Sequence, residues 1–263
     1  MGEVVVITSG KGGVGKTTTT AGLGVALAMA GKSVVALDAD IGLRNLDVAL
    51  GLADKIVYDL VDVIEQRCRL RQALVQHKKY QTLSLLAASQ TKEKDEVSPE
   101  GMEMLCRELR EQYDYVLIDC PAGLGRGFAN AIAAADRALV VTMPEVAAVR
   151  DADRVMDRLA KEGIEKRGLV INRMRPRLAE EGVLLKVEEI IEWLAIPLLG
   201  VIPEDEAVLR QTARGGLVSD DEKSLAARAY CNLAERLQGR TVPLLELDTK
   251  KRRRFFFGRK KRK

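Results

Sequence analysis

Two lysines and a threonine in a glycine-rich stretch near the N-terminus have types and spacing suited to phosphate chemistry. Residues 10–17 read Gly-Lys-Gly-Gly-Val-Gly-Lys-Thr and match the phosphate-binding loop pattern G-x-x-x-x-G-K-[ST]. Glycines let backbone N–H groups turn toward phosphate oxygens, while Lys16 suits the β- and γ-phosphates and the Thr17 hydroxyl suits Mg²⁺. A glycine-rich turn with solvated lysines is the alternative, and the apolar strand pattern before the loop and the helix pattern after it argue against this.

Three carboxylates follow apolar strand patterns. Asp119 ends one of them, and in phosphate-loop enzymes such an aspartate holds Mg²⁺, often through water; a helix cap or turn is its structural alternative. Asp38 and Asp40 are two residues apart, so in extended backbone their side chains point the same way. One could serve Mg²⁺ indirectly and the other could orient the attacking water, or both could belong to an Asp-rich turn. The spacing of Lys11 alone does not separate a functional side chain from a solvated one.

The elements that must position these residues alternate between strand and helix patterns. Such alternation predicts an α/β fold with a doubly wound, mostly parallel sheet and helices on both faces. Ligands of such sheets bind at the carboxyl ends of the strands, where the loop and the three carboxylates fall. The expected strands are residues 4–7, 33–38, 82–87, 115–119, 137–142, 168–172 and 198–202. The expected helices are residues 18–30, 58–66, 98–112, 128–135, 146–161, 183–194, 204–212 and 221–238.

Length and composition narrow the class of protein. With 263 residues, of which 47% are hydrophobic, the chain can bury a substantial core, as one large domain or two small ones. It has no run of 18 apolar residues, which predicts no transmembrane helix, and the strand pattern at its start argues against a signal peptide. The cell interior is the expected compartment.

Cysteine and histidine usage excludes several kinds of site. The four cysteines are widely scattered without a C-x-x-C pair, which indicates neither a disulfide framework nor a zinc or iron–sulfur site. His77 is the single histidine, so a His-rich metal site is excluded. A Ser-His-Asp triad would depend on that one residue, which we expect at the surface.

Charge is distributed very unevenly along the chain. Of the 42 basic residues, ten lie in the last fourteen positions, which leaves 32 against 38 acidic residues in the remaining 249. A mildly acidic body with a strongly basic end suggests an appended targeting segment. We expect residues 1–240 to form the phosphate-loop domain and residues 241–263 to form a flexible basic tail.

The residues just described resemble a known family. Residues 11–18, Lys-Gly-Gly-Val-Gly-Lys-Thr-Thr, resemble the deviant Walker A motif of the SIMIBI-class ParA/MinD ATPases. Residues 38–47, Asp-Ala-Asp-Ile-Gly-Leu-Arg-Asn-Leu-Asp, are similar to the switch I segment of its MinD branch. Further similar segments follow in the same order at residues 88–92, 118–123, 144–146 with 149–154, and 200–205. The resemblance covers the whole chain.

The resemblance implies a Mg²⁺-dependent ATPase that dimerises around two ATP molecules. Lys11 would reach the partner's phosphates, Asp40 would position the attacking water, and Asp38 and Asp119 would support Mg²⁺ with Thr17 as a direct ligand. Asn45 would contact phosphate or water in the closed dimer. The nucleotide would be held by residues of the loop, by Asn172 at adenine and by the Pro203 region: Gly10, Lys11, Gly12, Gly13, Val14, Gly15, Lys16, Thr17, Thr18, Asn45, Asn172 and Pro203.

The resemblance also implies a biological setting. ATP would drive dimerisation and binding to the cytoplasmic face of the cell membrane, MinC would be the recruited division inhibitor, and MinE would trigger hydrolysis and release, so that the division septum is placed. Two positions depart from the branch: Gly125 stands where an acid is usual, and Met143 where Asn or Thr is common. The change at Gly125 is expected to alter the detailed contacts of the switch II segment. The nucleotide chemistry is expected to be unchanged.

The basic tail holds three consecutive phenylalanines at residues 255–257. Three adjacent positions span about 200° of a helix and Gly258 weakens it, so a polybasic segment with aromatic insertion is a better description than an amphipathic helix. Each Lys or Arg at an anionic surface contributes about 1 kcal/mol, and two tails in a dimer would bind by avidity. The expected membrane contacts are Arg254, Phe255, Phe256, Phe257, Arg259 and Lys260.

Two other tail functions and two other activities compete with this interpretation. The tail could be solvated, or it could be a nucleic-acid arm, although contiguous Phe favours lipid. A ParA-like ATPase that segregates DNA through the basic tail is the main alternative function. A metal-cluster carrier or reductase of the same fold is disfavoured by the lack of paired cysteines.

Overall fold

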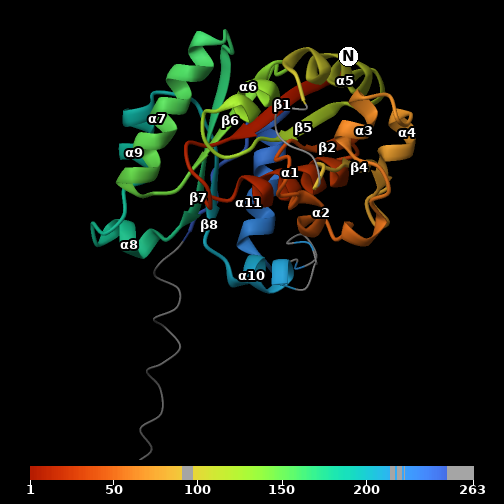
Figure 1. The fold of residues 1–263 in the computed structure, drawn as a ribbon. Coiled ribbons are helices and arrows are strands. Elements are labelled where there is room, and N and C mark those ends of the chain that lie inside the picture. Colours follow the sequence, from red (N-terminus) through yellow and green to blue (C-terminus); the bar gives the residue numbers. More distant parts are fainter. Residues whose placement is uncertain (91–96, 214–216, 218–220, 222, 248–263) are drawn as a thin grey trace, which may run out of the picture.

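An eight-stranded, almost entirely parallel sheet forms the centre of the molecule (Figure 1). The computed structural model describes residues 1–90, 97–213, 217, 221 and 223–247. The strand order is β3-β4-β2-β5-β1-β6-β7-β8, and within it only the β3–β4 pairing is antiparallel. The strands are β1 Glu3–Thr8, β2 Val34–Asp38, β3 Val75–Gln76, β4 Leu83–Leu86, β5 Tyr115–Asp119, β6 Arg137–Thr142, β7 Lys166–Met174 and β8 Leu198–Pro203.

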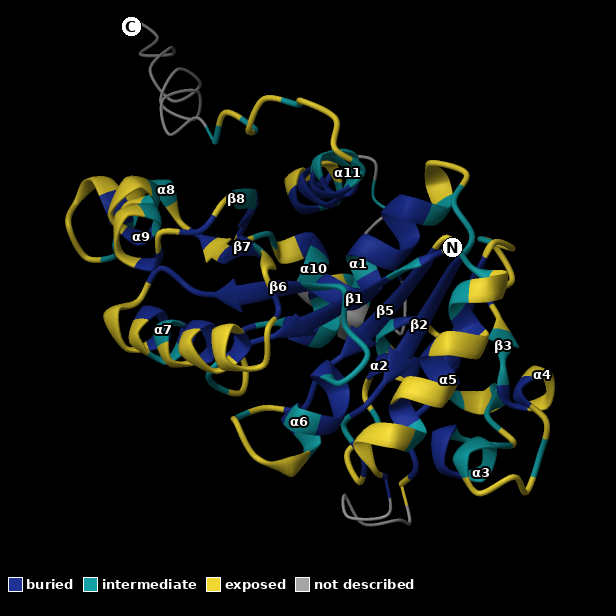
Figure 2. Cartoon of the chain, turned by 90° about the horizontal axis from the view of Figure 1, so that it is seen from above, coloured by how far each residue is buried: buried dark blue, intermediate teal, exposed yellow. Residues whose placement is uncertain are grey.

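Helices cover both faces of this sheet (Figures 1 and 2). One face carries α1 Lys16–Met29, α2 Leu46–Ala49, α10 Glu206–Ala213 and α11 Leu225–Leu237. The other carries α3 Leu60–Ile64, α4 Leu70–Ala73, α5 Pro99–Gln112, α6 Arg126–Ile132, α7 Val146–Lys161, α8 Pro176–Glu180 and α9 Val187–Leu194. A short 3₁₀ helix, η1 Ala53–Lys55, links α2 to α3. The predicted doubly wound α/β fold is therefore confirmed.

Strand alternation divides the interior into two hydrophobic cores. In β1, Val4 and Val6 belong to the core under α5 and α7, whereas Val5 and Ile7 belong to the core under α1 and α11. All four side chains are fully buried, because successive residues of a strand point to opposite faces and both faces here are covered. Burial on both sides explains why the strands read as continuous apolar runs.

All seven strands that the sequence predicted are present, with ends shifted by up to two residues. The two-residue β3 was not predicted, and neither were the short helices α2, α4 and α8. The predicted helix over residues 183–194 begins only at Val187. Residues before it are held elsewhere: the Leu185 N–H donates to the Pro144 carbonyl at 2.9 Å, and the Glu189 carboxylate accepts from the Lys186 N–H at 2.7 Å. The apolar pattern of residues 183–186 thus reflects packing outside a helix.

His77 does not lie at the surface, so that expectation was wrong. Only 8% of the residue is exposed. Its Nδ1 accepts from the N–H groups of Lys79 and Tyr80, both at 3.1 Å, in the turn between β3 and β4. The imidazole is buried because it satisfies turn donors that have no strand partner.

Candidate nucleotide site

The glycine-rich loop connects the end of β1 to the start of α1, as the sequence predicted. Gly13 and Gly15 have φ of 79° and 97°, in the left-handed region, and Gly15 is the N-cap of α1. Residues without a Cβ adopt this conformation at little cost. The loop therefore ends on the N-terminus of a 14-residue helix, whose unpaired N–H groups and dipole favour an anion.

Two glycines in the loop are also required by close neighbours. A Cβ at Gly10 would lie 2.2 Å from the Asp151 carbonyl oxygen in α7, and a Cβ at Gly15 would lie 2.2 Å from Asn172 Nδ2 at the end of β7. At Gly10 the neighbour is backbone, so no side-chain movement could make room for a Cβ, whereas at Gly15 a Cβ would have to displace the Asn172 side chain. The loop is thus pressed between its own strand, α7 and β7.

Lys16 turns back along the loop. Lys16 is only 8% exposed. Its Nζ donates to Ser9 Oγ at 3.0 Å, and Ser9 Oγ in turn donates to the Lys11 carbonyl at 2.8 Å. A chain of hydrogen bonds thus fixes a buried ammonium inside the loop, where β- and γ-phosphate oxygens would lie. The role of Ser9 was not predicted from the sequence.

Asp38 and Asp119 form a buried pair of carboxylates at the ends of neighbouring strands. They are register partners in the β2–β5 ladder and are 1% and 2% exposed. Burial raises the pKa of Asp38 to about 6, against backbone N–H donors that lower it. Burial, with repulsion from Asp38, raises the pKa of Asp119 to about 7. Such a pair is costly to ionise unless a cation is nearby.

The residues around Asp119 fit a Mg²⁺–nucleotide complex. The Thr20 hydroxyl donates to the Asp119 carboxylate at 3.3 Å, and the Thr17 hydroxyl interacts with the same carboxylate and lowers its pKa. Among the residues that the structure describes, no three or more Asp, Glu, His or Cys side chains are arranged so that they could hold a metal ion by themselves. A hard cation at this place would therefore take few protein oxygens and complete its shell with phosphate oxygens and water, as Mg²⁺ does.

Asp38 has a structural task besides any catalytic one. Its carboxylate accepts from the N–H groups of Asp40 at 3.0 Å and of Asn45 and Leu46, both at 3.1 Å. These bonds fold the segment after β2 over the strand end and begin α2. Asp40 is therefore held at the strand ends, beside the carboxylate pair, as expected. Asn45 is exposed and its side chain makes no cap to α2, so its contacts in this chain leave it open to a ligand or partner.

Lys11 contacts a different part of the molecule from Lys16. Its side chain is 38% exposed, and its Nζ lies 3.9 Å from Glu145 Oε2 at the N-cap of α7. An exposed ion pair at this distance contributes little, so the lysine can exchange Glu145 for another anion at low cost. Glu145 was not singled out as the counter-ion of Lys11 from the sequence.

Asn172 lies against the phosphate loop. It is 6% exposed, and its Nδ2 donates to the Val14 carbonyl at 2.8 Å. Arg173, the next residue, has φ of 53°, and the β7–β8 register is interrupted there before Met174 pairs with Pro203. This irregularity brings Asn172 and Pro203 to the strand ends that carry the loop.

The two departures from the family pattern leave the fold intact. Gly125 is the N-cap of α6 with an ordinary negative φ, and no atom lies within 4 Å of a Cβ placed there. Met143 is buried at the end of β6. Arg254, Phe255, Phe256, Phe257, Arg259 and Lys260 lie outside the described residues.

Comparison with known proteins agrees with this site. Residues 5–218 match the family model of the CobQ/CobB/MinD/ParA nucleotide binding domain. The chain is 50% identical over 250 residues to the septum site-determining protein MinD of Bacillus subtilis (strain 168), covering 94% of this chain and 93% of that protein.

Solved structures are similar over the same extent. The MinC:MinD cell division protein complex of Aquifex aeolicus aligns with a TM-score of 0.87 at 43% identity, over 93% of this chain and 99% of that one. The septum site-determining protein MinD complexed with Mg-ADP from Pyrococcus horikoshii OT3 aligns with a TM-score of 0.82 at 32% identity, over 90% and 96%. This chain therefore belongs to the MinD branch of the CobQ/CobB/MinD/ParA family of nucleotide-binding ATPases.

Proposed function

We propose that ATP drives this chain through a cycle of dimerisation and membrane binding. The chain is a Mg²⁺-dependent ATPase of the Min system, which helps to place the division septum, as its family and its relatives show. The observation that carries the proposed cycle is the position of Lys11. The loop holds one lysine buried for its own phosphates and presents the other outward, where a second copy of the chain could receive it.

In the proposed dimer, each Lys11 leaves Glu145 and reaches the phosphates bound by the partner. There it would stabilise the negative charge that spreads over the transferring phosphoryl group, a task that lysine or arginine performs in other phosphoryl-transfer enzymes. Hydrolysis then requires two chains. Asp40, held beside the carboxylate pair by Asp38, would orient the attacking water, and Asn45 would contact phosphate or water once the dimer closes.

Within one chain, the loop residues 10–18 would cradle the phosphates, with Lys16 between the β- and γ-phosphates. Mg²⁺, when bound, supplies charge neutralisation across the phosphates, held by Thr17 directly and by Asp38 and Asp119 through water. Asn172 and the Pro203 region would hold adenine. The bond from Asn172 Nδ2 to Val14 leaves its Oδ1 as the acceptor for an exocyclic amine.

The output of the cycle lies in the basic tail. Among the helices that the structure describes, none combines the length and apolar character needed to cross a bilayer. We propose that Arg254, Phe255, Phe256, Phe257, Arg259 and Lys260 bind an anionic membrane surface on its cytoplasmic face, weakly in a monomer and firmly as a pair in the ATP dimer.

Partners follow from the relatives. The Aquifex protein forms a complex with MinC. We propose that the dimer of this chain recruits a MinC-type division inhibitor, and that MinE or an equivalent topological factor triggers hydrolysis and release.

Vesicle and DNA pelleting would test the proposal against a ParA-like role. The full chain with Mg-ATP is expected to pellet with anionic vesicles and not with duplex DNA. Deleting residues 252–263 should abolish lipid binding and leave nucleotide binding unchanged. Pelleting with DNA but not with vesicles would favour DNA segregation, and loss of ATP binding in the truncated chain would contradict a separable tail.

A further inference from the structure

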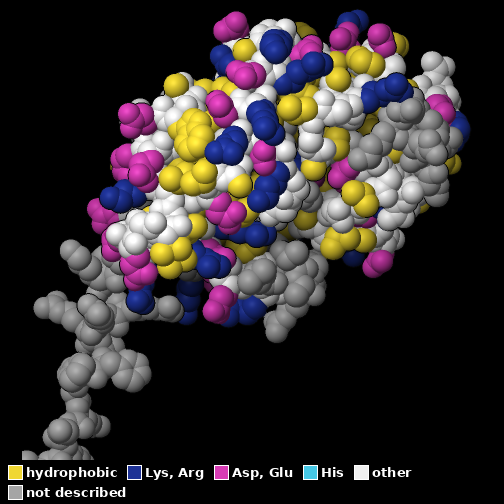
Figure 3. All heavy atoms as spheres, turned by 60° about the vertical axis from the view of Figure 1, so that its left-hand side comes forward, with side chains coloured by type: hydrophobic (Ala, Val, Ile, Leu, Met, Phe, Trp, Pro, Cys, Tyr) yellow, Lys and Arg dark blue, Asp and Glu magenta, His cyan; other side chains and the backbone are white. Residues whose placement is uncertain are grey.

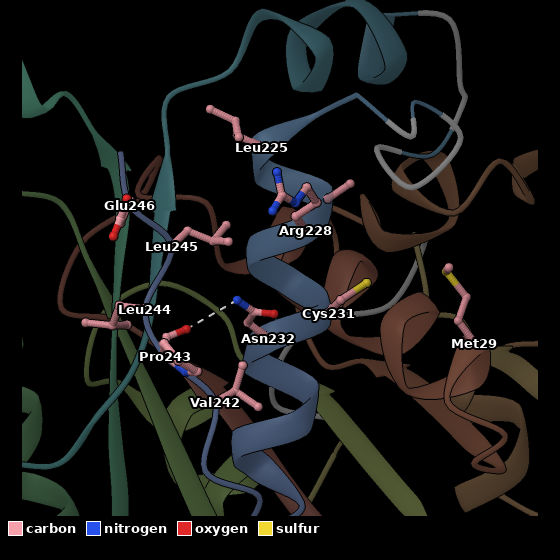
Figure 4. Close-up of a pocket in the computed structure, with 11 residues that line it drawn as sticks. Met29, Leu225, Arg228, Cys231, Asn232, Val242, Pro243, Leu244, Leu245 and Glu246 are labelled. Atoms are coloured by element: carbon pink, nitrogen blue, oxygen red, sulfur yellow. Dashed lines mark hydrogen bonds between the residues drawn. The ribbon is translucent and has the colours of Figure 1, made fainter. Parts of the chain in front are cut away.

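The last described segment of the chain crosses from one face of the sheet to the other. Residues 241–247, which we call the strap, leave α11 and run past the edge strand β8 (Figure 4). Arg236 in α11 fastens the start of the strap: its guanidinium donates to the carbonyls of Val242 at 2.9 Å, Pro243 at 2.7 Å and, on β8, Leu199 at 2.9 Å. The course of the strap is therefore fixed.

Successive leucines of the strap contact different cores. Leu245 packs against the core under α1 and α11, and in Figure 4 it points toward α11 while Leu244 points the other way. Leu247 packs against the core under α7 and α9. By its last described residue the chain has therefore reached the face that carries α8 and α9.

A groove lies where the strap arrives on that face. Its volume is 350 Å³, within the range of about 300–1,000 Å³ that suits small-molecule and side-chain-sized ligands. Most of its lining is apolar, and its exposed rim carries Glu180, Glu188 and Lys186. The apolar lining comes from β7, β8, α8, α9 and the strap, which contributes Leu244, Leu245 and Leu247.

We propose that the phenylalanines of the chain's own tail, Phe255–Phe257, dock in this groove when the protein is not on a membrane. This rests on the proposed role of the tail as membrane anchor. The groove would then hold the tail in the unbound state and release it to lipid, so that one aromatic cluster has two competing sites.

The reach of the chain favours this occupant. Phe255 lies eight positions after Leu247, which lines the groove, with seven residues between them. Fully extended, eight positions span about 26 Å, so the phenylalanines can fold back to the groove beside the point where the tail leaves it. Because the two are joined by one short segment, their effective concentration is high and a weak contact suffices.

Charge complementarity selects this groove over a larger one on the other side of the strap. The other groove, of 690 Å³ between α11 and the strap, has one Arg and one Glu, Arg228 and Glu246, in its lining (Figure 4). The groove at α8 and α9 has two acids and one lysine, and Glu189 and Glu192 are exposed on the same helix. Figure 3 shows acidic and basic side chains interspersed with exposed apolar ones on this side of the molecule. A tail with ten basic residues and three Phe matches this combination.

Hydrogen–deuterium exchange of the full chain without lipid or nucleotide tests the docking directly. The triple variant Phe255→Ser, Phe256→Ser, Phe257→Ser is expected to exchange several-fold faster than the wild type at residues 176–189 and 244–247, with α5 unchanged as an internal reference. The difference should persist on dilution, as an intramolecular contact requires. Equal exchange at the groove in both proteins would overturn the proposal, and a difference that vanishes on dilution would assign the groove to a second copy's tail.

Two matched charge reversals test the competition with lipid. Glu188→Lys on the groove rim is expected to increase, several-fold, the fraction of nucleotide-free protein bound to anionic vesicles. Glu103→Lys on α5 adds the same charge away from the groove and should have a much smaller effect. Equal effects would show that the groove does not withhold the tail. If no variant binds vesicles, the proposed membrane function fails, and the exchange experiment still decides whether the tail docks.

Discussion

Asp38 and Asp119 face each other as register partners at the carboxyl ends of β2 and β5, and both are almost fully buried. Two carboxyl groups so close in a dry environment resist double ionisation. Ionising both carboxyl groups therefore costs electrostatic free energy, and a bound cation would offset that cost. The pair lies directly beside Thr17 and the phosphate loop.

The first prediction concerns stability against pH in the absence of nucleotide and Mg²⁺. Because the folded-state pKa of Asp119 is raised from 3.8 to about 7, its stabilising contribution is complete below pH 3.8 and lost as the pH rises through about 7. Asp119→Asn should therefore be more stable than the wild type at pH 8, by a free energy of unfolding on the order of 2 kcal/mol, and nearly equal at pH 4. Urea denaturation at both pH values measures this. A difference in the free energy of unfolding between the two proteins that does not change with pH would contradict this prediction.

The second prediction concerns Lys11. Because its side chain contacts Glu145 and not the interior of its own loop, Lys11→Ala should bind ATP with nearly wild-type affinity. Its activated hydrolysis should fall by roughly the 10³-fold or more that loss of such a charge costs in related chemistry. Fluorescent-nucleotide titration and phosphate release measure the two quantities. Glu145→Gln, which removes only the counter-ion, serves as the control and should retain hydrolysis; retained hydrolysis in Lys11→Ala would remove the trans role.

The third prediction distinguishes two reasons why a side chain is not tolerated at Gly15, its positive φ and the close contact with Asn172. Gly15 and Gly31 both have positive φ, of 97° and 80°, but a Cβ meets Asn172 only at Gly15. Gly31→Ala should cost about 1 kcal/mol of stability and leave nucleotide binding intact. Gly15→Ala should in addition displace Asn172 and abolish measurable nucleotide binding. Similar nucleotide affinities for the two variants would show that the contact is unimportant.

The fourth prediction concerns Asn172 as the connection between the base site and the loop. Asn172→Ala removes a buried hydrogen bond to Val14 and the acceptor proposed for adenine, so ATP affinity should fall by about 10-fold or more. Asn232→Ala, which removes an exposed 3.5 Å contact to the strap, is the matched control and should bind ATP normally. The comparison uses competition between ATP and GTP. If Asn172→Ala keeps both its affinity and its preference for ATP, the residue has no role at the base.

The sequence predicted the sheet because buried parallel strands are continuous apolar runs, and it predicted the loop because glycine and lysine spacing is tied to backbone geometry. It failed where tertiary contacts decide. His77 stands among polar neighbours yet is buried by hydrogen bonds to a turn, and β3 is too short to leave a pattern. The apolar residues before Val187 suggested a longer helix because packing alone, without helical hydrogen bonds, gives the same pattern.

At the nucleotide site, the main functional residues could be predicted from the sequence, but most of their hydrogen-bond and ion-pair partners could not. Thr20 could have been found from its position three residues after Thr17, on the same side of α1. Ser9 and Glu145 could not, since their bonds to Lys16 and Lys11 depend on how the loop turns and where α7 begins. The dual task of Asp38, holding the segment that carries Asp40, likewise appears only in three dimensions.

The central claim is that ATP in this loop controls the tail at the other end of the chain. Its most direct test is the fraction of full-length protein bound to anionic vesicles with Mg²⁺ and either a non-hydrolysable ATP analogue or ADP. We predict several-fold more binding with the ATP analogue, because only that state pairs two tails. Equal binding with the two nucleotides, at saturating concentrations of each, would contradict the claim.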